Sequence, residues 1–163
     1  MITPSGEIST GLQDLRDRAF RAFMKIRRDL GPNFNQDIPL ILSIIDSLVK
    51  PILLYACDFW GCFKLHNSNH IDTFYISMLK QILGVQRQTT NDGVLLELGR
   101  TPLSLEAKKL SIKNWERIIR GNANQPILLS LQEPIDLDLP WTSQIKSCME
   151  NIGFLNFYTG IIP

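Results

Sequence analysis

The sequence lacks the features that mark several large classes of protein. It has three cysteines in 163 residues, an odd number without a short repeating spacing, unlike the framework of a secreted disulfide-rich protein. It has no strong excess of either charge, because 17 Lys and Arg against 16 Asp and Glu give a net charge of +1. Collagen-like, mucin-like and acidic-tail compositions are excluded. The composition is that of one globular domain, and any electrostatic recognition must be local.

A long uninterrupted apolar run is also missing. The most hydrophobic stretch, residues 38–60, contains Asp46, Lys50, Pro51 and Asp58, which are costly at the centre of a bilayer. Residues 1–10 have neither the basic nor the apolar part of a signal peptide. We therefore expect an intracellular protein, nuclear or cytoplasmic, that is not secreted and has no membrane partner.

Motifs for catalysis and cofactor binding are absent as well. No two acidic residues are adjacent, and the close pair Asp136 and Asp138 has no supporting glycine or histidine. A two-metal carboxylate site is therefore not indicated. The sequence contains no Walker glycine loop and no dinucleotide-binding fingerprint. We expect no cofactor and no catalytic residue.

One group of soft ligands could form a metal site. Cys57, Cys62, His66 and His70 fall within 14 residues, and these side-chain types can hold zinc. Their spacing is unlike that of the common zinc fingers, and the aromatic residues around them are typical of a packed segment. Buried thiols and loop histidines are the preferred interpretation, with zinc as the less favoured alternative.

Apolar periodicity and the placement of glycine and proline predict an all-α fold. The predicted helices lie near residues 11–30, 37–60, 68–83, 93–98 and 102–120, with short helices at 127–132 and 142–151. Pro51 should kink or restart the second of these helices. Residues 1–10 are the one candidate for a strand remnant. We divide the chain into a helical domain over residues 1–120 and a C-terminal extension over residues 121–163.

The first and the last long helices are predicted to be amphipathic. The apolar stripe of the first contains Leu12, Leu15, Ala19, Phe23, Ile26 and Leu30. The apolar side of the last contains Leu103, Ala107, Leu110, Trp115 and Ile118, widened by Leu105, Ile112 and Ile119. Short polar side chains before three helices are expected N-caps: Ser9 or Thr10, Asp37, and Thr101.

Basic residues are concentrated on two helix faces. Residues 10–30 carry six basic and three acidic residues, residues 64–120 carry nine and five, and the last 43 residues carry one and four. In the first helix, four cations fall within an arc of about 80° opposite the apolar stripe: Arg18, Arg21, Lys25 and Arg28. In the last helix, Lys109, Lys113, Arg117 and Arg120 share a face. Such faces can bind the phosphates of a nucleic acid.

The same charges have a purely structural interpretation. Three acid–base pairs lie four residues apart: Asp14 with Arg18, Asp17 with Arg21, and Glu116 with Arg120. Each such pair stabilises a surface helix by a few tenths of a kcal/mol, and charge alone favours this solvated-face interpretation. Lys25, Arg28, Lys109 and Lys113 lack an acidic residue four positions earlier, which makes them the better candidates for phosphate contact.

Four stretches of the chain occur together in one known family. They are FRAFMKIRRDLG (residues 20–31), DSLVKPILLYACDFWG (46–61), LKQILGVQRQTTN (79–91) and GVLLELGRTPLSL (93–105). With KKLSIKNWERI at residues 108–118, they resemble in order and spacing the segment downstream of the palm in non-LTR, LINE-type retrotransposon reverse transcriptases. The resemblance covers roughly residues 5–120.

The resemblance implies a helical thumb that holds a template-primer duplex. The family's aromatic-x-Asp-Asp signature is absent, so we expect a catalytically inactive fragment of such an enzyme. The implied partner is the backbone of RNA, DNA or their hybrid, bound without sequence preference, with a palm domain or another protein chain as a further partner. Backbone contact carries over to Arg21, Lys25 and Arg28, with Lys109 and Lys113 as a second patch. The expected affinity is on the order of 10⁻⁴ to 10⁻⁶ M.

Two alternatives stay open. The chain could be a helical protein-interaction module, because a thumb without its palm would expose apolar side chains, including Ile38, Leu40, Ile41 and Phe59. It could also be the product of a degenerate element that has no function of its own.

Overall fold

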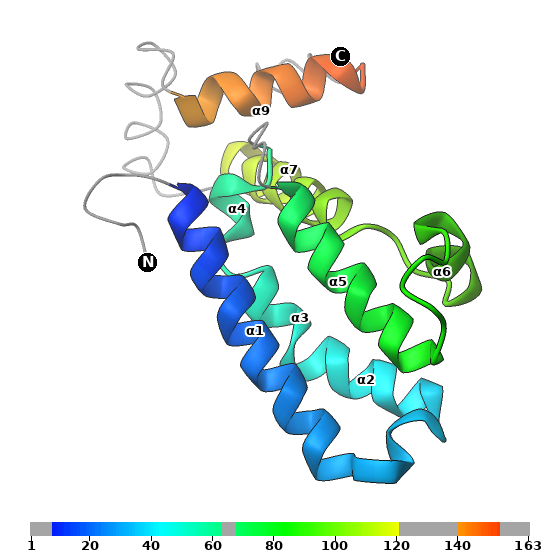
Figure 1. Ribbon diagram of the computed structural model, residues 1–163. Coiled ribbons are helices and arrows are strands. Elements are labelled where there is room, and N and C mark those ends of the chain that lie inside the picture. The colour runs from blue at the N-terminus through cyan, green and yellow to red at the C-terminus, as the bar shows by residue number, and fades with distance from the viewer. Residues whose placement is uncertain (1–7, 63–67, 121–139, 154–163) are drawn as a thin grey trace. The chain divides into compact units, whose positions relative to one another are not determined.

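Every described element of the computed structural model is a helix. The structure describes residues 8–62, 68–120 and 140–153 (Figure 1). The helices are α1 (Ile8–Leu30), the 3₁₀ helix η1 (Gly31–Asn35), α2 (Ile38–Leu48), α3 (Lys50–Leu53), α4 (Cys57–Trp60), α5 (Ser68–Leu83), α6 (Asn91–Glu97), α7 (Leu103–Arg120) and α9 (Pro140–Asn151). No strand occurs in these described ranges, which confirms the all-α prediction. The helix expected at residues 127–132 lies outside them.

The chain divides into two units that interleave along the sequence. Unit 1 consists of residues 1–55 and 65–105, and unit 2 consists of residues 56–64 and 106–163. Unit 1 therefore holds α1 to α3, α5 and α6, whereas unit 2 holds α4, α9 and most of α7. None of the three boundaries between the units falls at residue 120, where the sequence analysis divides the chain. Residues 56–64, which include α4, belong to unit 2 because they pack on α7.

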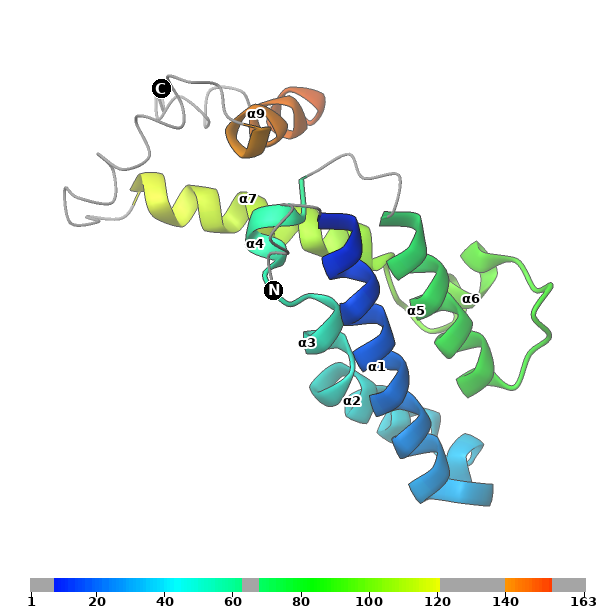
Figure 2. The same cartoon turned by 60° about the vertical axis from the view of Figure 1, so that its left-hand side comes forward.

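The core of unit 1 is built on α1. Leu12, Ala19 and Phe23 of the predicted stripe are buried, and the ring of Phe23 meets that of Phe34 edge-on at 5.8 Å between centroids. In Figures 1 and 2, α3 and α5 pack against α1, and α2 packs against α3 and α5. The helices α2, α3 and α5, with Val49 between α2 and α3, supply most of the remaining buried side chains: Ile41, Ile45, Val49, Leu53, Ile71, Tyr75, Met78, Leu79 and Ile82.

The ends of α1 and α2 test the predicted caps. Helix α1 begins at Ile8, so Ser9 and Thr10 lie inside it and the N-cap prediction for them is wrong. Residues 8–10 are consequently helical and not a strand remnant, while residues 1–7 lie outside the described range. The prediction for Asp37 is confirmed, because its Oδ1 accepts a hydrogen bond from the backbone N–H of Leu40 at 3.0 Å.

The segment predicted as one helix over residues 37–60 is broken twice. The first break falls at Val49, and α3 restarts with Pro51 in its first turn, as expected for a residue that lacks an N–H donor. The second break was not predicted. It falls at residues 54–56, where Ala56 has a φ of 56° in the left-handed region. Because few residues other than glycine adopt this conformation, sequence pattern gave no sign of the turn.

The core of unit 2 joins α7, α9 and the residues after α4. Cys62, Trp115, Ile145 and Met149 form this core, with Trp141 and Cys148 packed against it. The backbone of Gly61 lies so close to α7 that a Cβ there would come within 2.6 Å of the carbonyl carbon of Ala107. The Ser111 hydroxyl donates a hydrogen bond to the carbonyl oxygen of Asp58 at 2.9 Å. Helix α4 therefore binds α7 through backbone groups.

Two apolar residues of α7 depart from the predicted pattern. Leu103, Ala107 and Trp115 are buried as expected, but Leu105 is 53% exposed and Leu110 is 37% exposed. The prediction that these two leucines join the buried side is wrong, because the surface that α7 packs against is narrower than its apolar side. Among the described helices, none combines the length and the apolar character needed to cross a membrane.

Candidate nucleic-acid interface

The four cations of α1 form an exposed surface, which we call the α1 ridge: Arg18, Arg21, Lys25 and Arg28. All four side chains are exposed, whereas Ala19 and Phe23 on the opposite side of the helix are fully buried. The helix thus has a solvent-exposed basic face and a buried apolar face, as its periodicity predicted. The ridge is open to a large polyanion.

The ion pairs of α1 differ from those expected. Asp14 binds Arg18 at 2.8 Å as predicted. Asp17, however, binds Arg16 at 3.0 Å and not Arg21, so the predicted Asp17–Arg21 pair is wrong. Both the Nε and the Nη2 of Arg16 donate hydrogen bonds to Asp17 Oδ1. Within the described part of the chain, Arg21 is left without a carboxylate.

The other two ridge cations are also weakly engaged. Lys25 has no ion pair among the described residues. The Nε of Arg28 lies 3.8 Å from Asp29 Oδ1, beyond hydrogen-bond distance, and the Arg28 side chain is 78% exposed. Such an exposed pair contributes little to stability. Arg21, Lys25 and Arg28 therefore remain available for contact with phosphates.

The second basic patch lies on α7 in unit 2. Lys109 and Lys113 are exposed, and neither has an ion pair within the ranges that the structure describes. Arg117 instead donates to Asn114 Oδ1 at 2.8 Å, and the side chain of Arg120, with its expected Glu116 pair, lies outside the described residues. The patch is thus reduced to Lys109 and Lys113. It is smaller than the α1 ridge, which belongs to unit 1.

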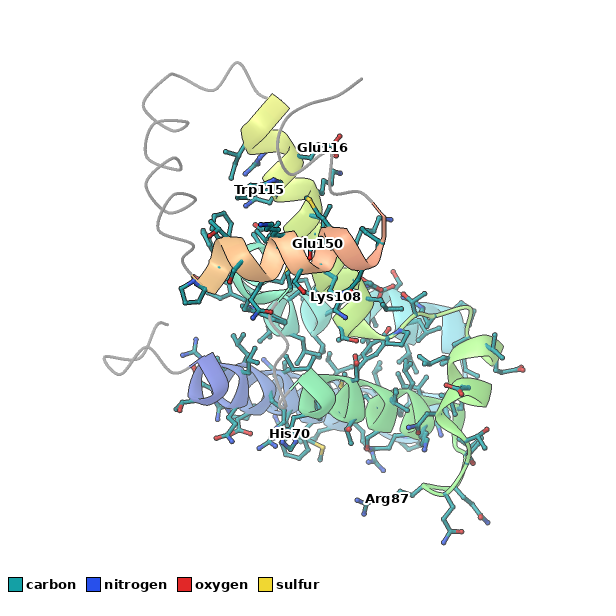
Figure 3. The ribbon with its side chains drawn as sticks, turned by 90° about the horizontal axis from the view of Figure 1, so that it is seen from above. His70, Arg87, Lys108, Trp115, Glu116 and Glu150 are labelled. Carbon is teal, nitrogen blue, oxygen red and sulfur yellow. The ribbon has the colours of Figure 1, made fainter. Side chains whose placement is uncertain are left out.

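A groove between α1 and α5 was not predicted from sequence. It has a volume of about 860 Å³ and lies wholly within unit 1. Two contacts hold its walls together: the rings of Phe20 and Phe74 meet edge-on at 6.3 Å, and Arg27 donates to Gln81 Oε1 at 2.7 Å. Figure 3 labels two residues that line it, His70 on α5 and Arg87 in the connection to α6.

Sequence reasoning missed the groove because its residues come from separate helices. Phe74 is only half-buried. Phe20 is 49% exposed and lies outside the apolar stripe predicted for α1, but periodicity within one helix does not show which ring of another helix it meets. The one available signal was the spacing of four between Arg16 and Phe20, which puts a cation and an aromatic ring on the same side of α1.

The residues proposed for zinc are not gathered in one described cluster. Within the described ranges, no group of three or more His, Cys, Asp or Glu could hold a metal ion. His70 is an exposed residue of unit 1, and His66 lies outside the described residues. Cys57 and Cys62 are buried free thiols of unit 2.

The surroundings of the two thiols favour their protonated form. Burial, with a smaller contribution from the charge of Asp58, raises the pKa of Cys57 to about 11. Burial likewise raises the pKa of Cys62 to about 12, against a smaller opposing effect of the hydrogen bond with Ser111. Both cysteines are therefore neutral thiols at neutral pH.

The apolar surface expected for a protein-interaction module is only partly present. Leu40 is 52% exposed and Ile38 is half-buried, but Ile41 is 1% exposed. The inclusion of Ile41 is wrong, because it points into the core of unit 1. Phe59 is exposed, and its ring contacts that of Trp141 at 6.0 Å between centroids in unit 2.

Comparison with known proteins gives no relative for this chain: no family model, no curated protein and no solved structure matches it.

Proposed function

We propose that this chain is a thumb-like helical domain that retains nucleic acid by its backbone, without sequence preference. The proposal follows the resemblance to the thumb region of LINE-type reverse transcriptases. It assigns no polymerase chemistry to the chain, because the metal-binding aspartate signature is absent from its sequence. The ligand is a duplex of template and primer, and the protein holds its phosphates.

The observation that supports this proposal most directly is that the positive charges of Arg21 and Lys25 are accessible. Both are exposed, and neither has a carboxylate partner among the described residues. A cation that is already paired gains little from a phosphate, whereas an unpaired one releases a counterion condensed on the nucleic acid. The rigid helix beneath them, anchored by buried Ala19 and Phe23, keeps their spacing fixed.

The salt dependence of binding tests the proposal. Fluorescence anisotropy of the full chain with a blunt RNA–DNA hybrid is measured between about 50 and 200 mM salt. Each lost phosphate contact should reduce the slope of log affinity against log salt by about 1. The Lys25→Gln variant should therefore lose about 1 from this slope, and the Arg21→Gln/Lys25→Gln variant about 2.

A matched control separates a specific ridge from general charge. Lys146 on α9 of unit 2 is also exposed, so Lys146→Gln removes the same charge without changing the ridge and should leave the slope unchanged. Equal slopes for the wild type and the double variant would remove the site assignment. Binding that does not depend on salt would argue against phosphate contact altogether.

A protein-interaction function is the second candidate, favoured by the surface of α2. Leu40 and Leu48 are 52% and 56% exposed, and with half-buried Ile44 they repeat every four residues along one side of the helix. Self-association is the simplest use of such a stripe. Sedimentation of the wild type and of Leu40→Gln/Leu48→Gln tests it, since an assembly lost only in the variant would support this function.

A further inference from the structure

The α1–α5 groove has an aromatic wall. Phe20 is 49% exposed, because it lies beside the stripe of α1 that supplies the core and not within it. Its partner Phe74 holds it edge-on at 6.3 Å between ring centroids, so the face of a ring remains free for another contact. An exposed, positioned aromatic ring is a platform on which a planar base can stack.

The polar part of the groove is basic. Arg16, Lys80 and Arg87 line it together with one carboxylate, that of Asp17. Asp17 is already paired with Arg16 at 3.0 Å, so Lys80 and Arg87 remain as the cations without a carboxylate partner among the described groove residues. Lys80 donates from Nζ to the backbone carbonyl of Arg87 at 3.0 Å. This bond ties the side chain of Lys80 on α5 to the backbone of the α5–α6 connection, and both cations line the same groove.

The length of the groove suits a short chain of nucleotides. His70, Phe74, Ser77 and Gln81 line it at spacings of four, three and four along α5, which places them on one side of that helix. The first and the last are eleven positions apart, or about 16 Å along the axis. That distance corresponds to about four to five stacked nucleotides at about 3.4 Å each.

We propose that the α1–α5 groove binds a short single-stranded segment of RNA or DNA, with a base stacked on Phe20 and phosphates bound by Lys80 and Arg87. A duplex does not fit this chemistry, because its base faces are already stacked on one another. The proposal rests on the proposed nucleic-acid function and deepens it: the α1 ridge holds paired strands, and the groove holds an unpaired one. The positive charge of the groove suits an acidic peptide as well as a nucleic acid. The exposed ring of Phe20, on which a base can stack, favours the nucleic acid.

The groove and the ridge can be separated by mutation. Phe20 and Lys25 are five positions apart on α1, about 140° around the helix, so a variant at one site leaves the other in place. Phe20→Leu keeps an apolar side chain but removes the stacking face. Arg87→Gln removes an exposed charge in a connection whose bond to Lys80 uses only the backbone of residue 87.

The experiment measures anisotropy of short labelled oligo(dT) and oligo(rU), and of a blunt RNA–DNA hybrid, with the full chain. Phe20→Leu should lower affinity for a single strand about five- to tenfold, the lower end of the effect of losing one stacked base. Arg87→Gln should lower it less and reduce its salt dependence. Both variants should bind the hybrid within about twofold of the wild type. A loss of affinity for oligo(dT), for oligo(rU) or for both supports the groove proposal and tells whether the groove binds DNA, RNA or both.

Controls make each failure distinct. Phe59→Leu changes another exposed phenylalanine, which belongs to unit 2, and should leave single-strand affinity unchanged. If the hybrid binds through the ridge but Phe20→Leu and Arg87→Gln bind single strands like the wild type, the groove proposal is overturned and the proposed function stands. If the groove variants lose affinity for single strands, but the ridge variants bind the hybrid with wild-type affinity and salt dependence, the function proposed for the ridge is overturned instead. Binding of an oligoglutamate, but of no oligonucleotide, would overturn both.

Discussion

Asp46 on α2 and Arg100, which precedes α7, are joined by a forked contact in unit 1. The Arg100 Nη1 lies 2.7 Å from both carboxylate oxygens of Asp46, and the side chains are only 35% and 20% exposed for Asp46 and Arg100 respectively. The pair ties two segments that are 54 residues apart. Partial burial makes this contact more valuable than the exposed pairs of α1.

We predict that Asp46→Asn lowers the free energy of unfolding by about 1 to 2 kcal/mol, because it leaves the Arg100 guanidinium partly buried without its counter-charge. Urea unfolding followed by far-UV circular dichroism measures the change. Asp29→Asn is the matched control, since Asp29 is exposed and 3.8 Å from Arg28; its effect should stay below about 0.5 kcal/mol. Equal effects of the two variants would contradict the prediction.

The start of α7 depends on a residue from another helix. The carboxylate of Asp72 on α5 accepts a hydrogen bond from the backbone N–H of Ser104 at 2.9 Å, and so satisfies one of the free donors at the helix N-terminus. Asp72→Ala should therefore destabilise the fold by about 1 kcal/mol. Asp72→Asn keeps an acceptor oxygen and should cost less, so a thermal melt in which both variants lose the same stability would argue against capping.

The local features of this fold were predictable because they repeat with the period of one helix. The stripe with Ala19 and Phe23, the ridge with Arg21 and Lys25, and the Asp37 cap all depend on residues within a few positions of one another. These are the scales at which helical geometry acts. The all-α fold and the exposure of the α1 ridge therefore agree with the sequence analysis.

The features that the sequence did not predict depend on contacts between different helices. Asp72 and Ser104 are 32 positions apart, and the groove exists only because Phe20 meets Phe74. Periodicity marks Leu105 as apolar but cannot tell whether a partner covers it. The choice of Asp17 between Arg16 and Arg21 is likewise decided by side-chain geometry. The basic ridge was thus found from sequence, whereas the groove beside it required the tertiary packing.

The close approach of Gly61 to α7 gives a third prediction. A Cβ at residue 61 would lie within 2.6 Å of the Ala107 carbonyl carbon and 2.7 Å from the Cys57 carbonyl oxygen, and backbone cannot move aside as a side chain can. Gly61→Ala should therefore cost about 1 to 3 kcal/mol, measured by urea unfolding.

The control for this variant is a glycine with a movable neighbour. A Cβ at Gly93 would lie 2.8 Å from Thr90 Oγ1, and this side chain makes no capping hydrogen bond that would hold it in place. Gly93→Ala in α6 should be neutral or stabilising by up to about 1 kcal/mol, because alanine favours helix. A neutral Gly61→Ala would show that α4 and α7 are not in backbone contact.

The buried thiols of unit 2 give a prediction for pH. The raised pKa values of Cys57 and Cys62, about 11 and about 12, mean that both stay protonated in the folded chain well above the pH at which they ionise when unfolded. Stability from this difference is fully present below the unfolded pKa, and it is lost as pH rises from about 9 toward 11 to 12. Urea unfolding at pH 8 and at pH 10.5 should show this fall.

Alkylation distinguishes these thiols from other groups that titrate at high pH. At pH 8, the thiolate fraction should be about a hundredfold lower for Cys57 and about a thousandfold lower for Cys62 than for a thiol of ordinary pKa 9.0. Iodoacetamide followed by peptide mass spectrometry should therefore label both slowly in the native chain and rapidly in urea. Rapid native labelling of Cys62 at pH 8 would contradict its burial beneath α7 and α9, because only an accessible thiolate reacts.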